Sequence, residues 1–107
     1  MSRPEKIAKG HPFMIVIGGW YGGSIIEVST VSEVDGPYGS GKNKLIDITL
    51  ANHRNVPLRS WVWNVNDIKW VKNPKVLGWD LEWHVNKKIR DAIKKYGGAW
   101  VVRLRAS

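Results

Sequence analysis

The sequence predicts an α+β fold: a small, strongly bent antiparallel β-barrel or sheet of five to six strands, with one C-terminal amphipathic helix followed by a last strand. Three observations predict this class. Short β-branched runs alternate with turns rich in glycine, asparagine and proline, which is typical of short strands. One segment near the C-terminus shows helical spacing of its apolar residues. With 107 residues, 43% of them hydrophobic, the chain suits one compact domain with a buried core.

Residues 1–11 are polar and form a basic arm that we expect to be flexible, ahead of a single β-rich domain over residues 12–107. Residues 12–17 are apolar and end at a glycine-rich turn, as a buried strand does. His11 and His53 fall in the arm and in a later turn, where an exposed histidine usually has no special role.

Residues 24–34 are dense in β-branched side chains and predict a long second strand. The alternation of its apolar residues breaks near Ser29 and Thr30, so we expect a bulge or a sharp bend there. Residues 35–43 contain three glycines and a proline, which predicts a loop.

Residues 44–51 place three apolar side chains on one face and predict a strand, and residues 56–64 predict the next. The asparagines between them tolerate left-handed backbone, as a hairpin connection requires. Residues 66–72 suit a short turn and another strand, and the alternation over residues 99–105 predicts the last one.

One helix is predicted over residues 80–96. Asp80 is a favourable N-cap, Glu82 adds negative charge to the first turn, and a pair of glycines follows the last turn. The apolar residues recur at i, i+4 and i+8 and form one stripe. These are Leu81, Val85, Ile89, Ala92, Ile93 and Tyr96.

The run from Ile46 to Asn52, followed by Val56, Pro57 and Leu58, resembles the central hairpin of SH3-like small barrels of the KOW and Tudor kind. The resemblance covers about residues 13–71, lies at the level of the fold, and leaves the helix unexplained. It implies a module that binds nucleic acid or protein rather than an enzyme.

Charge is unevenly distributed along the chain. Lys and Arg number 17 against 9 Asp and Glu, for a net charge of +8. Residues 13–35 contain three acidic residues and no base, so they carry −3 and the rest of the chain carries +11. Such polarity favours a basic patch, and a polyanion is the first partner to consider.

Several function classes are excluded or disfavoured. The absence of cysteine excludes disulfides, thiolate metal sites and cysteine nucleophiles. No apolar run approaches the ~20 residues of a membrane-spanning helix, and no cleavable signal is recognised, so we expect an intracellular protein.

Residues 36–43 follow the spacing of a phosphate-binding P-loop up to Asn43, where that motif needs Ser or Thr. A strand rather than a helix is expected after it, so we expect no nucleotide cofactor.

Asp80, Glu82 and His84 lie close together at the expected start of the helix, where two carboxylates and an imidazole resemble metal ligands. Capping and the helix dipole already explain the two acidic residues, so we expect no metal. No set of residues has the spacing of a nucleophile with its base, and we expect no enzyme.

The first candidate site lies on the predicted helix. Trp83, Lys87, Arg90 and Lys94 fall on the side opposite the apolar stripe. A tryptophan among cations there either contacts a base, a sugar or a protein, or packs beneath a loop or a partner subunit.

The second candidate site lies on the strands. Arg59, Trp61 and Trp63 alternate on one face of a strand, where tryptophans either stack on bases or fill the core. Further lysines flank this strand in the sequence and can neutralise phosphates. They are Lys69, Lys72, Lys42 and Lys44.

These observations predict a non-catalytic nucleic-acid-binding protein that contacts phosphates through Lys and Arg, with tryptophans stacking or wedging between bases. DNA and RNA are both open. The alternative is a small protein-interaction module, such as an inhibitor or adaptor, that binds an acidic protein surface. A compact, cysteine-free, Trp-rich chain also suits a small phage protein.

Overall fold

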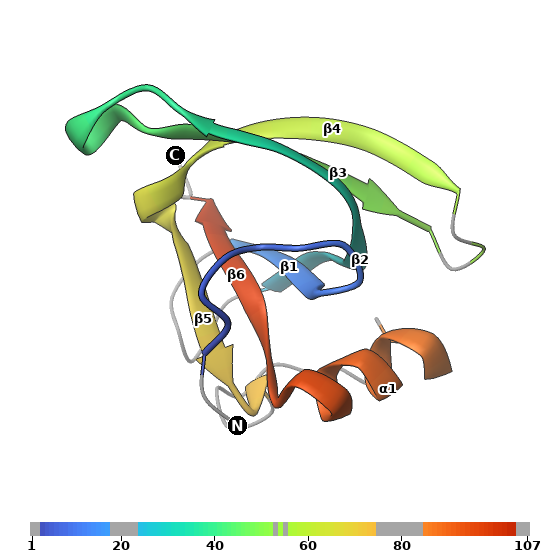
Figure 1. The fold of residues 1–107 in the computed structure, drawn as a ribbon. Helices are drawn as coiled ribbons and strands as arrows, with labels where there is room; N and C mark the ends of the chain where they lie inside the picture. The colour runs from blue at the N-terminus through green and yellow to red at the C-terminus, as the bar shows by residue number, and fades with distance from the viewer. Residues whose placement is uncertain (1–2, 18–23, 53, 55, 75–84, 105–107) are drawn as a thin grey trace.

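The computed structural model describes residues 3–17, 24–52, 54, 56–74 and 85–104 (Figure 1). The described residues form six strands, one α-helix and two short 3₁₀ turns. In chain order these are β1 (Pro12–Ile17), β2 (Ser24–Tyr38), η1 (Gly41–Asn43), β3 (Leu45–Ala51), β4 (Pro57–Asn64), η2 (Val65–Asp67), β5 (Ile68–Lys72), α1 (Lys87–Tyr96) and β6 (Gly98–Leu104).

The six strands form one sheet in the order β4-β3-β2-β1-β6-β5. The predicted α+β class, with a helix before the last strand, is confirmed, but two details differ. The sheet is mixed, because β6 lies between β1 and β5 and runs parallel to β1. The sheet is also open, with β4 and β5 as its two edges, so a closed barrel is not confirmed.

Strand β2 bends the sheet, since its first half pairs with β1 and its second half with β3. The register with β1 shifts at Ile26, and the register with β3 shifts at Ser32. The irregularity expected near Ser29 and Thr30 is therefore split into two bulges, one on each side of these residues. Each extra residue adds twist. Together the two bulges fold the upper strands, β3 and β4 with the second half of β2, over the lower strands β1, β5 and β6 (Figure 1).

The loop predicted over residues 35–43 is shorter in the structure. Strand β2 continues to Tyr38, with Asp35 opposite Asp47 and Tyr38 opposite Leu45. Gly36 makes this possible, because its φ of 107° lies in a region open to glycine and lets the strand bulge without ending.

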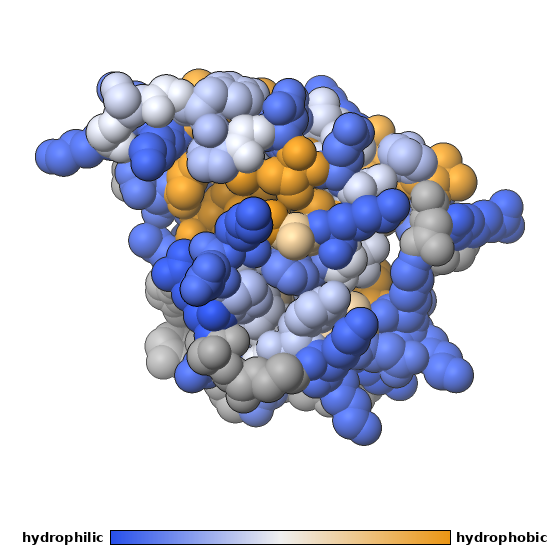
Figure 2. Space-filling model, viewed as in Figure 1, coloured by the Kyte–Doolittle hydropathy of each residue, from blue (hydrophilic) through white to orange (hydrophobic). Residues whose placement is uncertain are grey.

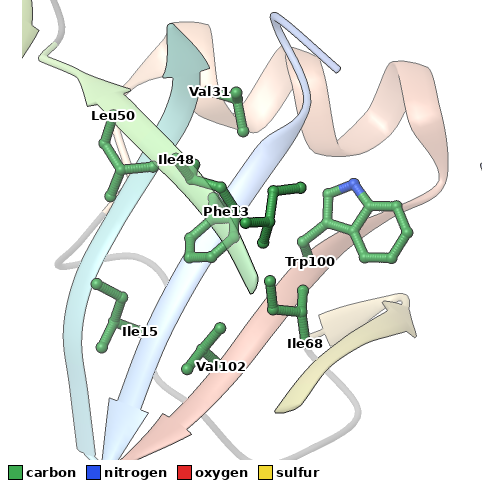
Figure 3. Packing of buried hydrophobic residues seen from close by; sticks show 9 residues of the cluster. Phe13, Ile15, Val31, Ile48, Leu50, Ile68, Trp100 and Val102 are labelled. Carbon is green, nitrogen blue, oxygen red and sulfur yellow. The ribbon is translucent and has the colours of Figure 1, made fainter. Parts of the chain in front are cut away.

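The bent sheet has a core on each face. Side chains alternate along β1, so Phe13 and Ile15 point into the inner face, between the upper and lower strands. They meet Trp100 and Val102 of β6 beneath Ile48 and other apolar residues of the upper strands (Figure 3). Met14 and Val16 point to the outer face, where Ile89 of α1 covers them.

Helix α1 starts later than predicted. Asn86 is its N-cap, with extended backbone and a side-chain Oδ1 that accepts the N–H of Ile89 at 3.0 Å. Val85 and Asn86 are therefore outside the helix, contrary to the range 80–96, while Asp80 and the rest of residues 80–84 lie outside the described residues. The predicted C-terminal end is confirmed, because Gly97 has a φ of 78° and ends the helix in left-handed conformation.

The N-terminal arm contacts the inner core. Ile7 packs against the inner cluster, and His11 is only 7% exposed, contrary to the exposed histidine expected there. In Figure 1 the arm crosses in front of β6, and in Figure 2 apolar side chains show at the surface between the arm and the upper strands. The flexibility predicted for residues 1–11 stays a prediction.

Candidate nucleic-acid interface

Helix α1 is densely positive. Five of its ten residues are Lys or Arg and one, Asp91, is acidic. Ile89 is buried and Ile93 packs beside it on the outer core, whereas all five cations are exposed. At ~100° per residue the cations fall on two flanks of the helix. Lys87, Arg90 and Lys94 form one flank, and Lys88 and Lys95 form the other.

A groove of about 430 Å³ lies between α1 and the middle of β2, the end of β3 and the start of β4. Its cations are Lys9 from the arm and Lys88 from the helix, while Thr30, Pro57 and Ala92 contribute to its walls. No described residue that lines this groove is acidic. The groove therefore joins the arm to one flank of α1 through a surface that favours an anion.

Lys9 is a groove residue that sequence reasoning missed. The backbone beside it is fixed to β2, because the N–H of Gly10 donates to the carbonyl of Val31 at 2.8 Å and the N–H of Val31 donates to the carbonyl of His11 at 2.9 Å. Nothing in the sequence pattern of the arm indicates this pairing, since glycine and histidine are poor strand signals.

The predicted row of Arg59, Trp61 and Trp63 forms along the inner face of β4. The Arg59 guanidinium carbon lies 4.9 Å from the centroid of the Trp61 ring. The Trp61 and Trp63 rings stack with centroids 5.8 Å apart and planes at 15°. Trp63 in turn lies 6.4 Å from the ring of Phe13 and packs against the inner core.

The two expectations for the tryptophans were that they fill the core or that they stay accessible for stacking on bases, and the two residues differ in this respect. Trp63 serves the core, while Trp61 is half-buried and Arg59 is exposed. Arg59 and Trp63 flank Trp61 on either side along the strand. The Trp61 ring is therefore already in contact with Arg59 and with Trp63.

The remaining predicted cations lie elsewhere. Lys42 lies in η1 and Lys44 directly follows it; both are exposed, at the end of β3 and β4 farthest from α1 (Figure 1). Lys69 and Lys72 lie on the edge strand β5. The structure thus does not gather the predicted site residues into one patch, and Trp83 lies outside the described residues.

The outer face of the upper strands is acidic. Glu33 and Asp35 of β2 and Asp47 of β3 line a hollow of about 420 Å³ together with Thr49 and Ser60. Within the described part of the chain, no cluster of histidine, cysteine or acidic side chains has the arrangement of a metal site. These acidic side chains share the outer face of the sheet with α1 but lie on β2 and β3, and no residue of α1 lines their hollow.

His11 is the polar centre of an aromatic cluster that sequence reasoning missed. Its Nδ1 accepts the backbone N–H of Ala8 at 3.1 Å and the indole N–H of Trp100 at 3.1 Å. The Tyr96 ring lies 4.7 Å away, edge-on. Burial lowers the pKa of His11 below its ordinary 6.5, which favours the neutral imidazole that this acceptor role requires. The one signal in the sequence is its place directly before a buried strand.

The chain matches no protein-family model, no curated protein and no solved structure. Among the described residues, no helix has the length and apolarity needed to cross a membrane. The resemblance to SH3-like barrels therefore stays a prediction.

Proposed function

We propose that this protein binds nucleic acid without catalysing a reaction, through contacts of lysine and arginine side chains with phosphates. The observation that carries the proposal is α1, whose five exposed cations stand against one acidic residue. Phosphate contacts dominate the affinity of proteins for nucleic acids, and each cation that neutralises a phosphate releases a counterion. Such a partner is met inside the cell, in agreement with the location expected from the sequence.

The two flanks of α1 take different parts in this binding. Lys88 faces the groove, where Lys9 offers a second cation to the same stretch of the nucleic acid's sugar–phosphate backbone. Lys87, Arg90 and Lys94 face away from the groove and extend the contact to neighbouring phosphates. Contacts of this kind position a nucleic acid but do not read its bases, so the binding is independent of sequence.

A salt series with labelled duplex and single-stranded oligonucleotides tests the proposal by fluorescence anisotropy. For the wild type, the logarithm of the binding constant is expected to fall linearly with the logarithm of the salt concentration. Replacement of Lys87, Arg90 and Lys94 by alanine should reduce that slope by roughly 2 to 3 units, since each phosphate contact contributes ~0.7–0.9. The helix remains intact, because the three side chains are exposed and alanine is a strong helix former.

A matched variant separates the helix from net charge. Replacement of Lys42, Lys44 and Arg54 by alanine removes the same charge from exposed positions outside α1. We expect this variant to change the slope less than the helix variant does. A larger effect of the loop variant would move the site away from α1, and no binding at about 50 mM salt would overturn the function itself.

A protein partner is the second candidate function. It is favoured by the exposed apolar side chains of β4, where Leu58 is 48% and Val62 57% exposed. A module that binds an acidic protein surface would use the same cations of α1, but it would show no affinity for oligonucleotides in the salt series.

A further inference from the structure

Strand β4 is an edge of the sheet, and its outer side is unpaired among the described residues. Five of its eight residues are exposed: Pro57, Leu58, Arg59, Ser60 and Val62. A free edge presents a row of backbone N–H and C=O groups to any strand that approaches it.

The two edges of the sheet differ in how they resist pairing. Natural edge strands are commonly protected by charged side chains, lysine above all. Strand β5 carries two lysines, Lys69 and Lys72, among its five residues. Strand β4 carries one charge in eight residues, and that charge, Arg59, lies over the ring of Trp61. Edge β4 is therefore the less protected one.

Exposed apolar side chains gather on the same hairpin. Six large hydrophobic residues of the described chain are exposed, and four of them lie on β3, on β4 or just before β4. Val62 is the most exposed of the six, at 57%, and its neighbour across the outer face at the start of β3, Leu45, is 39% exposed. Apolar side chains beside an open edge are typical of an interface.

We propose that β4 pairs in antiparallel fashion with β4 of a second copy of this chain, about a two-fold axis at Val62. Ser60 to Asn64 is the segment with an uninterrupted register against β3, since the register shifts nearer Pro57. Its sequence, Ser-Trp-Val-Trp-Asn, is self-complementary about its centre. The axis sets Val62 opposite the partner's Val62 and Trp61 opposite the partner's Trp63, and such apolar and aromatic cross-strand pairs stabilise a sheet.

The charge distribution favours a second copy at this edge. Two chains of net charge +8 repel one another, and most strongly if their α1 helices meet. Beside β4, in contrast, lies the acidic outer face, where Asp47 stands directly opposite Val62 in the register. Two copies that meet through Ser60 to Asn64 therefore meet beside this acidic hollow, at the end of β4 away from α1. This inference is independent of the proposed function.

A cross-linking experiment tests the axis, because the chain contains no cysteine. Residues directly opposite in an antiparallel pair have Cα atoms ~4.5–5.5 Å apart, within the ~4.4–6.8 Å that a disulfide spans. We expect Val62→Cys to form a covalent dimer under mild oxidation. The control is Val56→Cys, because Val56 is 52% exposed but precedes β4, far from its own copy in this register. Equal cross-linking of the two variants would overturn the proposal.

Sedimentation equilibrium provides the second measurement. Val62→Lys places two ammonium groups opposite one another and should raise the dimer dissociation constant on the order of 10-fold or more, whereas Val56→Lys should leave it unchanged. Circular dichroism checks that each variant is folded. The proposal fails if the wild type sediments as a 12.1 kDa monomer at every concentration, or if the dimer survives Val62→Lys.

Discussion

Nδ1 of His11 makes one of the contacts that hold the arm to the core, beside Ile7 and the backbone hydrogen bonds with Val31. Nδ1 accepts two hydrogen bonds, so the ring proton resides on Nε2 and the imidazole is neutral. Protonation of Nδ1 turns it into a donor that faces two other donors, the N–H groups of Ala8 and Trp100. The lowered pKa of His11 and these two bonds thus have the same origin, burial of the neutral ring.

The stability of the fold should therefore depend on His11 at mildly acidic pH. The folded pKa lies below 6.5, while the unfolded chain takes up the proton at about its ordinary pKa. The neutral His11 contributes fully to the free energy of unfolding above pH 6.5. This contribution is lost as the pH falls from there through the folded pKa, because the unfolded state binds more protons. Urea unfolding between about pH 7.5 and 5 measures this loss.

Two variants isolate the effect of this residue. His11→Asn removes the titrating group while keeping a side-chain acceptor, so its stability should vary less over that pH range than that of the wild type. His53→Ala should keep the dependence of the wild type. An equal pH dependence of His11→Asn and the wild type would assign the effect to another group.

Among the secondary-structure elements, α1 shows most clearly where a sequence pattern is ambiguous. Asp80 and Asn86 are both favourable N-caps, and the apolar stripe runs past both of them. In the structure Asn86 caps the helix, and Val85 packs against the outer core from outside it. Local propensity allows the helix to start after either Asp80 or Asn86, and in the structure it starts after Asn86. The other end carries an unambiguous signal, because glycine is favoured where left-handed backbone ends a helix.

The N-cap can be tested directly. Asn86→Ala removes the acceptor of the Ile89 N–H and should lower the free energy of unfolding by about 1 kcal/mol. Asn86→Asp keeps an acceptor at this position and should therefore retain most of the free energy of unfolding that Asn86→Ala loses. The measurement is denaturant unfolding, with helix content followed by circular dichroism. A loss as large for Asn86→Asp as for Asn86→Ala would contradict the capping role.

The strands of the sheet were largely predictable, whereas the functional residues were less so. Alternation located β3, β4 and β6 to within one or two residues, since period 2 is a strong signal for a half-buried strand, and a continuous apolar run before a glycine-rich turn located β1. It did not reveal that β4 is an edge, because a strand has the same pattern whether one or both of its sides are paired. The proposed dimer rests on the open backbone edge of β4, which follows from strand order, and on the exposure of Val62, which follows from an outer face that the described residues leave uncovered there.

Strand order is a property of the whole molecule. It accounts for most of the features that could not be predicted from the sequence, namely which strands pair and which strands are edges. The parallel pairing of β1 with β6 joins Phe13 to Trp100 across 86 intervening residues, and no local pattern specifies such a contact. It places β6 inside the sheet and leaves β5 as an edge on the opposite side from β4. The fold therefore needs another segment to cover the inner core where the sheet is open.

The N-terminal arm provides that cover, and its contribution is the final prediction. Ile7 packs against the inner core and, with Ile46, Ile68 and Trp100, lines a hollow of about 130 Å³ at the open side. Ile7→Ala should lower the free energy of unfolding by roughly 1–2 kcal/mol, less than the ~2–5 kcal/mol of a fully buried isoleucine, because Ile7 is only partly buried. Denaturant unfolding measures the loss, and binding of an apolar dye reports the newly exposed core.

Glu5→Ala is the matched control: Glu5 borders the same hollow, but its side chain is exposed, so its replacement should change neither stability nor dye binding. An Ile7→Ala variant as stable as the wild type would mean that the arm moves freely in solution, as the composition of residues 1–11 suggests. A measurable loss would show instead that Ile7 helps to hold a polar, basic segment on the core, together with His11 and the backbone hydrogen bonds to Val31. Lys9, fixed between Ile7 and His11, would then face the groove beside α1 before any phosphate arrives.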